Sequence, residues 1–79
     1  MENNMKKLIA LLEGIRPDVD FENEKSLIDD GLIESLDIVA IVTDVNDEFD
    51  ISINVNDLLP ENFNSAKALY ELITKLQYE

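Results

Sequence analysis

Hydrophobic residues of this chain recur at helical spacing in three separate stretches, divided by segments that lack the pattern. Within each stretch the apolar side chains fall three or four positions apart, which places them on one face of a helix. The stretches run from about Asn3 to Ile15, from Ser35 to Phe49, and from Asn64 or Ser65 to about Gln77. The faces predicted to be buried are Met5, Leu8, Ile9, Leu12 and Ile15; Ile38, Ile41, Val42, Val45 and Phe49; and Ala66, Leu69, Tyr70, Ile73 and Leu76.

The segment from Asp18 to Glu34 is a long connection for a chain of 79 residues. It follows Pro17, and the residue before a proline disfavours helical backbone angles, so the first helix is predicted to end there. A loop of this length usually packs through its own side chains or carries a function. We expect Phe21, Leu27 and Ile28 to pin this loop across the helices.

The segment after the second helix is predicted to turn the chain. The run from Asp50 to Asn54 alternates like a strand, but it is too short to build a sheet alone. Asn54 or Asn56 is expected to cap a short helix that continues through Leu59. Pro60 to Asn64 is then predicted to form a turn before the last helix.

These elements predict an all-α fold, a small antiparallel bundle of three main helices plus one short helix, with a long loop between the first and second helices. The chain has the size of one small domain, and residues 1–79 are predicted to form it. Cysteine and histidine are absent from the sequence, so apolar packing must stabilise the fold without disulfides or zinc–histidine sites.

Charge is unbalanced and unevenly spread along the chain. The sequence has 6 basic and 18 acidic residues, a net charge of −12. Such a chain is a poor partner for nucleic acids or anionic membranes and a good one for proteins with a basic patch. Between Ser26 and Ala66 there is no lysine or arginine, and the acids in this span are Asp29, Asp30, Glu34, Asp37, Asp44, Asp47, Glu48, Asp50, Asp57 and Glu61.

The N-terminal residues Met1 to Lys7 are polar, and no apolar run approaches the length of a membrane span. Neither a signal peptide nor membrane insertion is therefore expected. The absence of cysteine fits a reducing compartment. We expect a cytoplasmic protein, and nothing in the sequence requires more than a monomer.

The residues needed for most enzyme chemistry are missing. Without histidine or cysteine, neither a serine–histidine nor a cysteine–histidine pair can form. The two glycines, Gly14 and Gly31, are too few and too far apart for a phosphate-binding loop. No catalytic residue is therefore expected in this chain.

A metal site is not expected either, although one alternation resembles the start of a calcium-binding EF-hand loop: Asp44, Asn46, Glu48 and Asp50. The glycine required at the sixth place of that loop is Phe49 here, and the glutamate required at the twelfth place is Val55. These residues also lie mostly on a predicted helix, where a calcium loop cannot form.

One stretch combines a turn, a helix start and a single hydroxyl: Asp29-Asp30-Gly31-Leu32-Ile33-Glu34-Ser35-Leu36-Asp37. Gly31 permits backbone angles that other residues resist, and Ser35 opens the second helix. Position alone allows two interpretations of Ser35: a helix cap or first-turn residue, or a hydroxyl that another enzyme modifies. A phosphodiester there would sit at the positive end of the helix dipole.

Residues Asp30 to Asp37 resemble the phosphopantetheine attachment motif of acyl carrier proteins, in which a glycine turn precedes Asp-Ser-Leu and an acidic helix. The order of the predicted helices, the length and the acidity are similar to that family over nearly the whole chain. The resemblance implies that Ser35 carries a phosphopantetheine arm, which holds an acyl or aminoacyl group as a thioester and presents it to partner enzymes. It also implies a docking face made of Glu34, Leu36, Asp37, Val39, Ala40, Asp44, Asp47 and Glu48.

Two positions depart from the family pattern. Glu34 stands where an aspartate usually precedes the serine, and Ala40 stands where the family often has an acid. The first change bears on which phosphopantetheinyl transferase accepts the chain, and the second removes one docking contact. The other implied partner is an acyl- or aminoacyl-activating ligase or synthase with a basic docking patch.

The cargo stays open among fatty acyl, D-alanyl, other aminoacyl and polyketide groups. The stretch from Ile53 to Ser65 is less like the fatty-acid carriers and more similar to stand-alone carriers that serve amino-acid-activating ligases, including D-alanyl carrier proteins. The alternative function is an unmodified acidic interaction module that binds a basic partner through the second helix. Replacement of Ser35 distinguishes the two functions, because only the carrier needs its hydroxyl.

Overall fold

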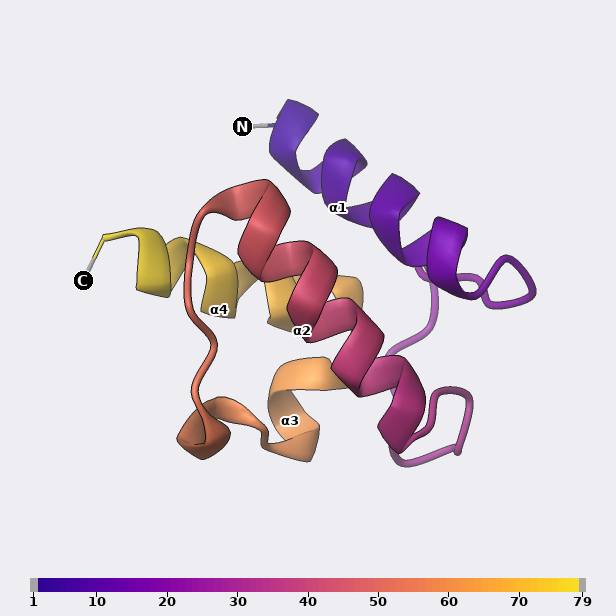
Figure 1. Ribbon diagram of the computed structural model, residues 1–79. Coiled ribbons are helices and arrows are strands. Elements are labelled where there is room, and N and C mark those ends of the chain that lie inside the picture. The colour runs from indigo at the N-terminus through magenta and orange to yellow at the C-terminus, as the bar shows by residue number, and fades with distance from the viewer. Residues whose placement is uncertain (1, 79) are drawn as a thin grey trace.

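The computed structural model describes residues 2–78, and every regular element in that range is helical. In chain order these elements are α1 (Glu2–Ile15), α2 (Ser35–Phe49), the 3₁₀ helix η1 (Val55–Asp57), α3 (Pro60–Phe63) and α4 (Ala66–Gln77). α2 runs back antiparallel to α1, and α4 passes behind α2 (Figure 1). The predicted all-α bundle is confirmed, and α2 has the predicted bounds.

The ends of the long helices follow from local sequence. α1 ends at Ile15 before the Arg16–Pro17 pair. α2 ends where Asp50 adopts left-handed backbone angles, φ 54° and ψ 52°. α4 begins after Ser65, whose Oγ accepts a 3.0 Å hydrogen bond from the backbone N–H of Ala68. Ser65 is therefore the cap of the last helix.

The segment before α4 differs from the prediction. Asn54 caps a short helix as expected, but this is η1, which ends at Asp57 and does not continue through Leu59. The predicted turn at Pro60 to Asn64 is wrong, because Pro60 is the first residue of the short helix α3. Proline suits that position, since its φ is already helical and the N–H it lacks would have no partner there.

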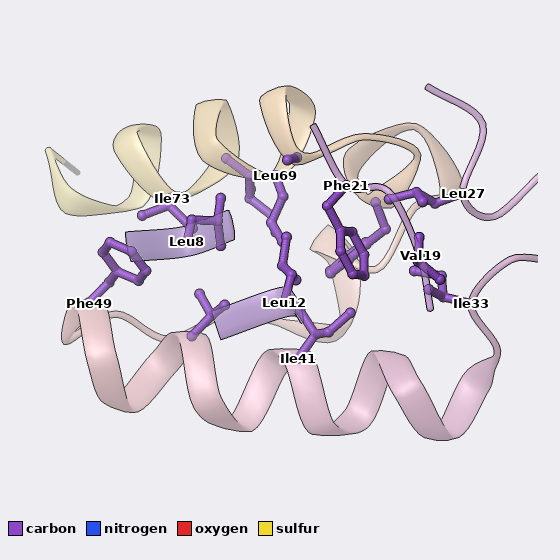
Figure 2. Close-up of a cluster of buried hydrophobic side chains, with 14 residues drawn as sticks. Leu8, Leu12, Val19, Phe21, Leu27, Ile33, Ile41, Phe49, Leu69 and Ile73 are labelled. Carbon is purple, nitrogen blue, oxygen red and sulfur yellow. The ribbon is translucent and has the colours of Figure 1, made fainter. Parts of the chain in front are cut away.

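A single cluster of buried apolar side chains lies between α1, α2 and α4. Figure 2 shows Leu8 and Leu12 of α1 between α2 and α4, with Ile41 and Leu69 pointing toward them. The long loop contributes to this core, as predicted. The buried residues are Leu8, Leu12, Val19, Phe21, Leu27, Ile33, Ile41, Val45, Phe49, Phe63, Ala66, Leu69, Leu72 and Ile73.

The predicted faces agree with this core in the main. Ile41, Val45 and Phe49 of α2 are buried, and Ile38 and Val42 are partly buried against them. In α4 the prediction omitted Leu72, which is buried, whereas Tyr70 and Leu76 are only partly buried. Within residues 2–78, no helix has both the length and the apolar character needed to cross a bilayer.

Candidate functional site

Ser35 is the first residue of α2, and its side chain is exposed. The N-cap position belongs to Glu34, which has extended angles of φ −119° and ψ 177°. Among residues 2–78 the Ser35 hydroxyl has no hydrogen-bond partner. Of the two structural roles considered for Ser35, the structure therefore shows the first-turn position and not the cap. Its hydroxyl stays free for chemistry at the positive end of the helix.

The cap of α2 is made by Glu34 and Asp37 together. The backbone N–H of Glu34 donates a 2.9 Å hydrogen bond to Asp37 Oδ2, which closes the first turn. The same oxygen accepts a 2.6 Å hydrogen bond from Arg16 Nη1, so the turn is also tied to the end of α1. Asp37, which we expected on the docking face, therefore mainly stabilises the first turn of α2 and its contact with the end of α1.

Arg16 is a site residue that sequence reasoning missed. Its Nε and Nη2 donate to Asp18 Oδ1 and Oδ2 at 3.1 Å and 3.0 Å, a two-pronged pairing. The hydrogen bond from Arg16 lowers the pKa of the Asp18 carboxyl, and the bonds to Asp18 and Asp37 raise the pKa of the guanidinium. Arg16 thus joins α1, the long loop and the start of α2 through one charged group.

The turn before Ser35 is held by backbone hydrogen bonds around Leu27. Gly31 has φ 70° and donates to the carbonyl of Ile28 at 3.0 Å. The carbonyl of Leu27 accepts from the N–H groups of Leu32 and Ile33 at 2.9 Å and 3.2 Å. The Ile33 side chain is buried, so the chain is anchored two residues before Ser35.

Asn64, which lies between α3 and α4, forms hydrogen bonds to the loop residues at the start of this turn. Its carbonyl accepts from the N–H of Leu27 at 2.8 Å. Its Oδ1 accepts from the N–H groups of Ile28 and Asp29 at 2.9 Å and 3.1 Å, and its Nδ2 donates to Asp29 Oδ2 at 3.2 Å. Sequence reasoning did not find this role of Asn64, because its side-chain partners are 35 and 36 residues away in the chain and no local pattern points to them.

The other residues expected on the docking face lie along α2. Leu36 is 84% exposed and Val39 is 62% exposed, although both are apolar. Ala40 is partly buried. The exposed acids of the predicted face are Glu34, Asp44, Asp47 and Glu48. α2 therefore presents apolar and acidic side chains together beside Ser35.

Glu48 has a partner within the chain. Its Oε2 lies 2.9 Å from Lys7 Nζ of α1, and the same ammonium group lies 5.5 Å from the centre of the Phe49 ring. Both ends of this pair are about half exposed, so it is a weak link between α1 and α2.

The acidic residues do not assemble a metal site in the described part of the chain, where no group of three or more carboxylates is placed to hold an ion. Of the residues that resemble an EF-hand, Asp44 and Glu48 lie on α2, and Asn46 Oδ1 accepts from the N–H of Ile53 at 3.0 Å. The Ser35 hydroxyl is exposed and has no hydrogen-bond partner among residues 2–78. Its place at the start of α2 suits a group attached through a phosphate ester.

Comparison with known proteins agrees with this geometry. Residues 4–73 match the family model described as "Phosphopantetheine attachment site". The chain is 34% identical over 76 residues to aminoacyl carrier protein 1 of Bradyrhizobium diazoefficiens, covering 90% of this chain and 83% of the relative. It is 33% identical over 75 residues to the acyl carrier protein of Buchnera aphidicola, covering 95% and 92%.

A third similar protein is the D-alanyl carrier protein of Streptococcus mutans, which is 28% identical over 60 residues, with 76% of each chain covered. No solved structure matches the chain. Carrier proteins of this kind hold phosphopantetheine covalently and act with synthases, ligases and transferases. The chain belongs to the phosphopantetheine-attachment family and is a carrier protein, not an enzyme, with covalent phosphopantetheine as its cofactor.

Proposed function

We propose that Ser35 is the attachment residue and that its phosphopantetheine thiol carries an acyl or aminoacyl group as a thioester. The observation that carries this proposal is the exposed Ser35 hydroxyl, which has no partner among residues 2–78 and stands at the first position of α2. The positive end of the helix dipole stabilises the negative phosphodiester formed there. The turn before Ser35 and the start of α2 present the attached arm, and partner enzymes catalyse the reactions of its cargo.

The partner proposal rests on the exposed face of α2. Leu36 and Val39 supply apolar contact area, and the acids beyond them supply charge that attracts a basic patch. The transferase that modifies Ser35 and the enzymes that load or receive the cargo are proposed to dock here in turn. Glu34, Leu36, Val39, Ala40, Asp44, Asp47 and Glu48 are the contacts we propose, with Asp37 supporting the corner beneath them.

An aminoacyl group is the cargo we favour. Two of the three similar proteins are named for aminoacyl or D-alanyl groups, whereas the third is an acyl carrier protein. A ligase that activates an amino acid would then load the thiol. We place this carrier in the cytoplasm, acting as a monomer in which the whole chain is one carrier unit.

Intact-mass measurement after incubation with coenzyme A and a broad-specificity phosphopantetheinyl transferase tests the proposal. The wild-type chain should gain one phosphopantetheine and Ser35→Ala should gain none. Ser52→Ala, which removes another exposed hydroxyl, should be modified like the wild type. Modification of Ser35→Ala would contradict the assignment, and a wild-type chain left unmodified would favour the acidic interaction module.

A further inference from the structure

Asn64 lies outside the docking face, yet it holds the turn that leads to Ser35. Four hydrogen bonds of 2.8 to 3.2 Å join its backbone carbonyl and its side chain to Leu27, Ile28 and Asp29. Within residues 2–78, no other residue outside the loop makes as many hydrogen bonds to it. The junction of α3 and α4 is thereby fixed to the loop between α1 and α2.

The connection from Asn64 to Ser35 is short. Leu27 donates its N–H to Asn64, and its own carbonyl accepts the N–H groups of Leu32 and Ile33. Glu34 and Ser35 follow directly, so a shift of Leu27 moves the backbone that enters α2. The body of α2 has separate anchors in the core, Ile41, Val45 and Phe49. Loss of the Asn64 contacts should therefore disturb the hydroxyl of Ser35 more than the docking side chains along α2.

The chemistry at this position suits an asparagine in particular. One oxygen accepts two backbone N–H groups, while the NH₂ group donates to the carboxylate of Asp29. A carboxylate at position 64 could accept the same two N–H groups, but it would face the Asp29 carboxylate with like charge. An alanine would leave both N–H groups without their side-chain acceptor.

We propose that Asn64 is a positioning residue for the modification of Ser35. This inference rests on the proposed attachment at Ser35 and goes beyond it by naming a residue that acts through the turn. A hydroxyl displaced by a fraction of an ångström from its reactive position is modified more slowly. The docking side chains stay in place, so the affinity of the transferase for the chain is unchanged. The effect of an Asn64 variant should therefore appear in kcat of phosphopantetheine transfer and not in KM.

The test measures initial rates of modification by the broad-specificity transferase with coenzyme A as donor. Asn64→Ala should lower kcat by about tenfold with KM within about twofold of wild type. The matched control is Asn46→Ala, which removes a side-chain acceptor for the N–H of Ile53 beyond the other end of α2. That variant should keep the wild-type kcat when both variants are assayed well below their Tm.

A rescue experiment separates positioning from general stability. Asn64→Asp should retain the fold, because its oxygen can accept the same N–H groups, but it should lower kcat through repulsion from Asp29. Adding Asp29→Asn reverses donor and acceptor across the contact, and this double variant should recover most of the wild-type kcat. The rescue also tests the inference if Asn64→Ala does not fold.

Three outcomes would overturn the inference. Equal kcat in wild type and Asn64→Ala would show that the turn needs no such support. A loss confined to KM would assign Asn64 to docking, and failure of Asp29→Asn to rescue Asn64→Asp would remove the proposed contact. A wild-type chain that gains no phosphopantetheine would instead overturn the attachment at Ser35, and this inference with it.

Discussion

Arg16 Nη1 lies 2.6 Å from Asp37 Oδ2, and the same carboxylate oxygen caps the N–H of Glu34 at 2.9 Å. One oxygen therefore receives hydrogen bonds from the end of α1 and from the residue before Ser35. Both side chains are less than a third exposed, so water competes less for this pair than for a fully exposed one. Asp37 is held in place for its capping role by a charge 21 residues away in the chain.

Arg16→Ala should lower the Tm, because it frees the long loop from α2 and leaves Asp37 without its charged partner. We expect a fall of about 3 °C, a modest loss because Arg16 lies near the surface, its partner Asp18 is mostly exposed, and ion pairs at the surface contribute little each. Lys25→Ala is the control, since it makes the same change in net charge without breaking an ion pair of the described chain. Thermal unfolding followed by circular dichroism measures both, and equal Tm values would contradict this role.

Asp18 should make the stability of the chain depend on pH at the acid end. Hydrogen bonding to Arg16 lowers the pKa of Asp18 below its ordinary 3.8 in the folded state. The carboxylate therefore stabilises the fold fully above about pH 4 and loses this effect as the pH falls through the lowered pKa. Asp18→Asn should have a lower Tm than wild type at pH 6, and the difference should shrink toward pH 2.

Glu22→Gln is the control for this pH series, since it removes an exposed acid of the same loop. At pH 6 the Tm of this variant should not lie below that of the wild type, because Glu22 belongs to no ion pair of the described chain. A deficit of Asp18→Asn that stays constant down to pH 2 would show that the Arg16 pair does not set the titration.

Asp50 is the one residue other than glycine with positive φ in residues 2–78, and it stands at the negative end of α2. Glycine adopts this conformation without strain, and its introduction also removes an unfavourable charge from the helix end. Asp50→Gly should raise the free energy of unfolding by about 0.5–1 kcal/mol. Asp47→Asn, which removes only a charge, should raise it less in urea unfolding. A destabilised Asp50→Gly would contradict the strain argument.

Apolar periodicity predicts the three long helices and their buried faces, because a helix that packs on one side needs one apolar stripe. The structure confirms α2 from Ser35 to Phe49. The error at Pro60 arose because proline marks both turns and first helical positions, and local sequence does not separate them. Arg16 and Asn64 were missed as site residues because their partners on the corner are distant in the chain. Motif reasoning singles out the hydroxyl of Ser35 as the attachment point, which stays a prediction, whereas the contacts that hold the turn before it depend on the tertiary fold.

Salt should stabilise this chain. Ten acids and no basic residue lie between Ser26 and Ala66, so like charges repel across the folded surface. Moderate sodium chloride or millimolar magnesium should raise the Tm by screening that repulsion. Differential scanning calorimetry across a salt series measures the effect, with an uncharged osmolyte series as the reference for solvent exclusion. A Tm that is flat or falls with salt would contradict this account of the surface.

Leu36 should act in partner docking and hardly at all in stability. Its side chain is 84% exposed beside Ser35, so Leu36→Ala should change the free energy of unfolding by less than about 0.5 kcal/mol. If the transferase buries this side chain, the KM for the carrier should rise by about tenfold while kcat changes little. That result is the reverse of the one expected for Asn64→Ala. Tyr78→Ala is the control, because Tyr78 is 85% exposed just past the end of α4 and should leave KM unchanged. An unchanged KM in Leu36→Ala would show that the transferase does not dock on the start of α2 through Leu36.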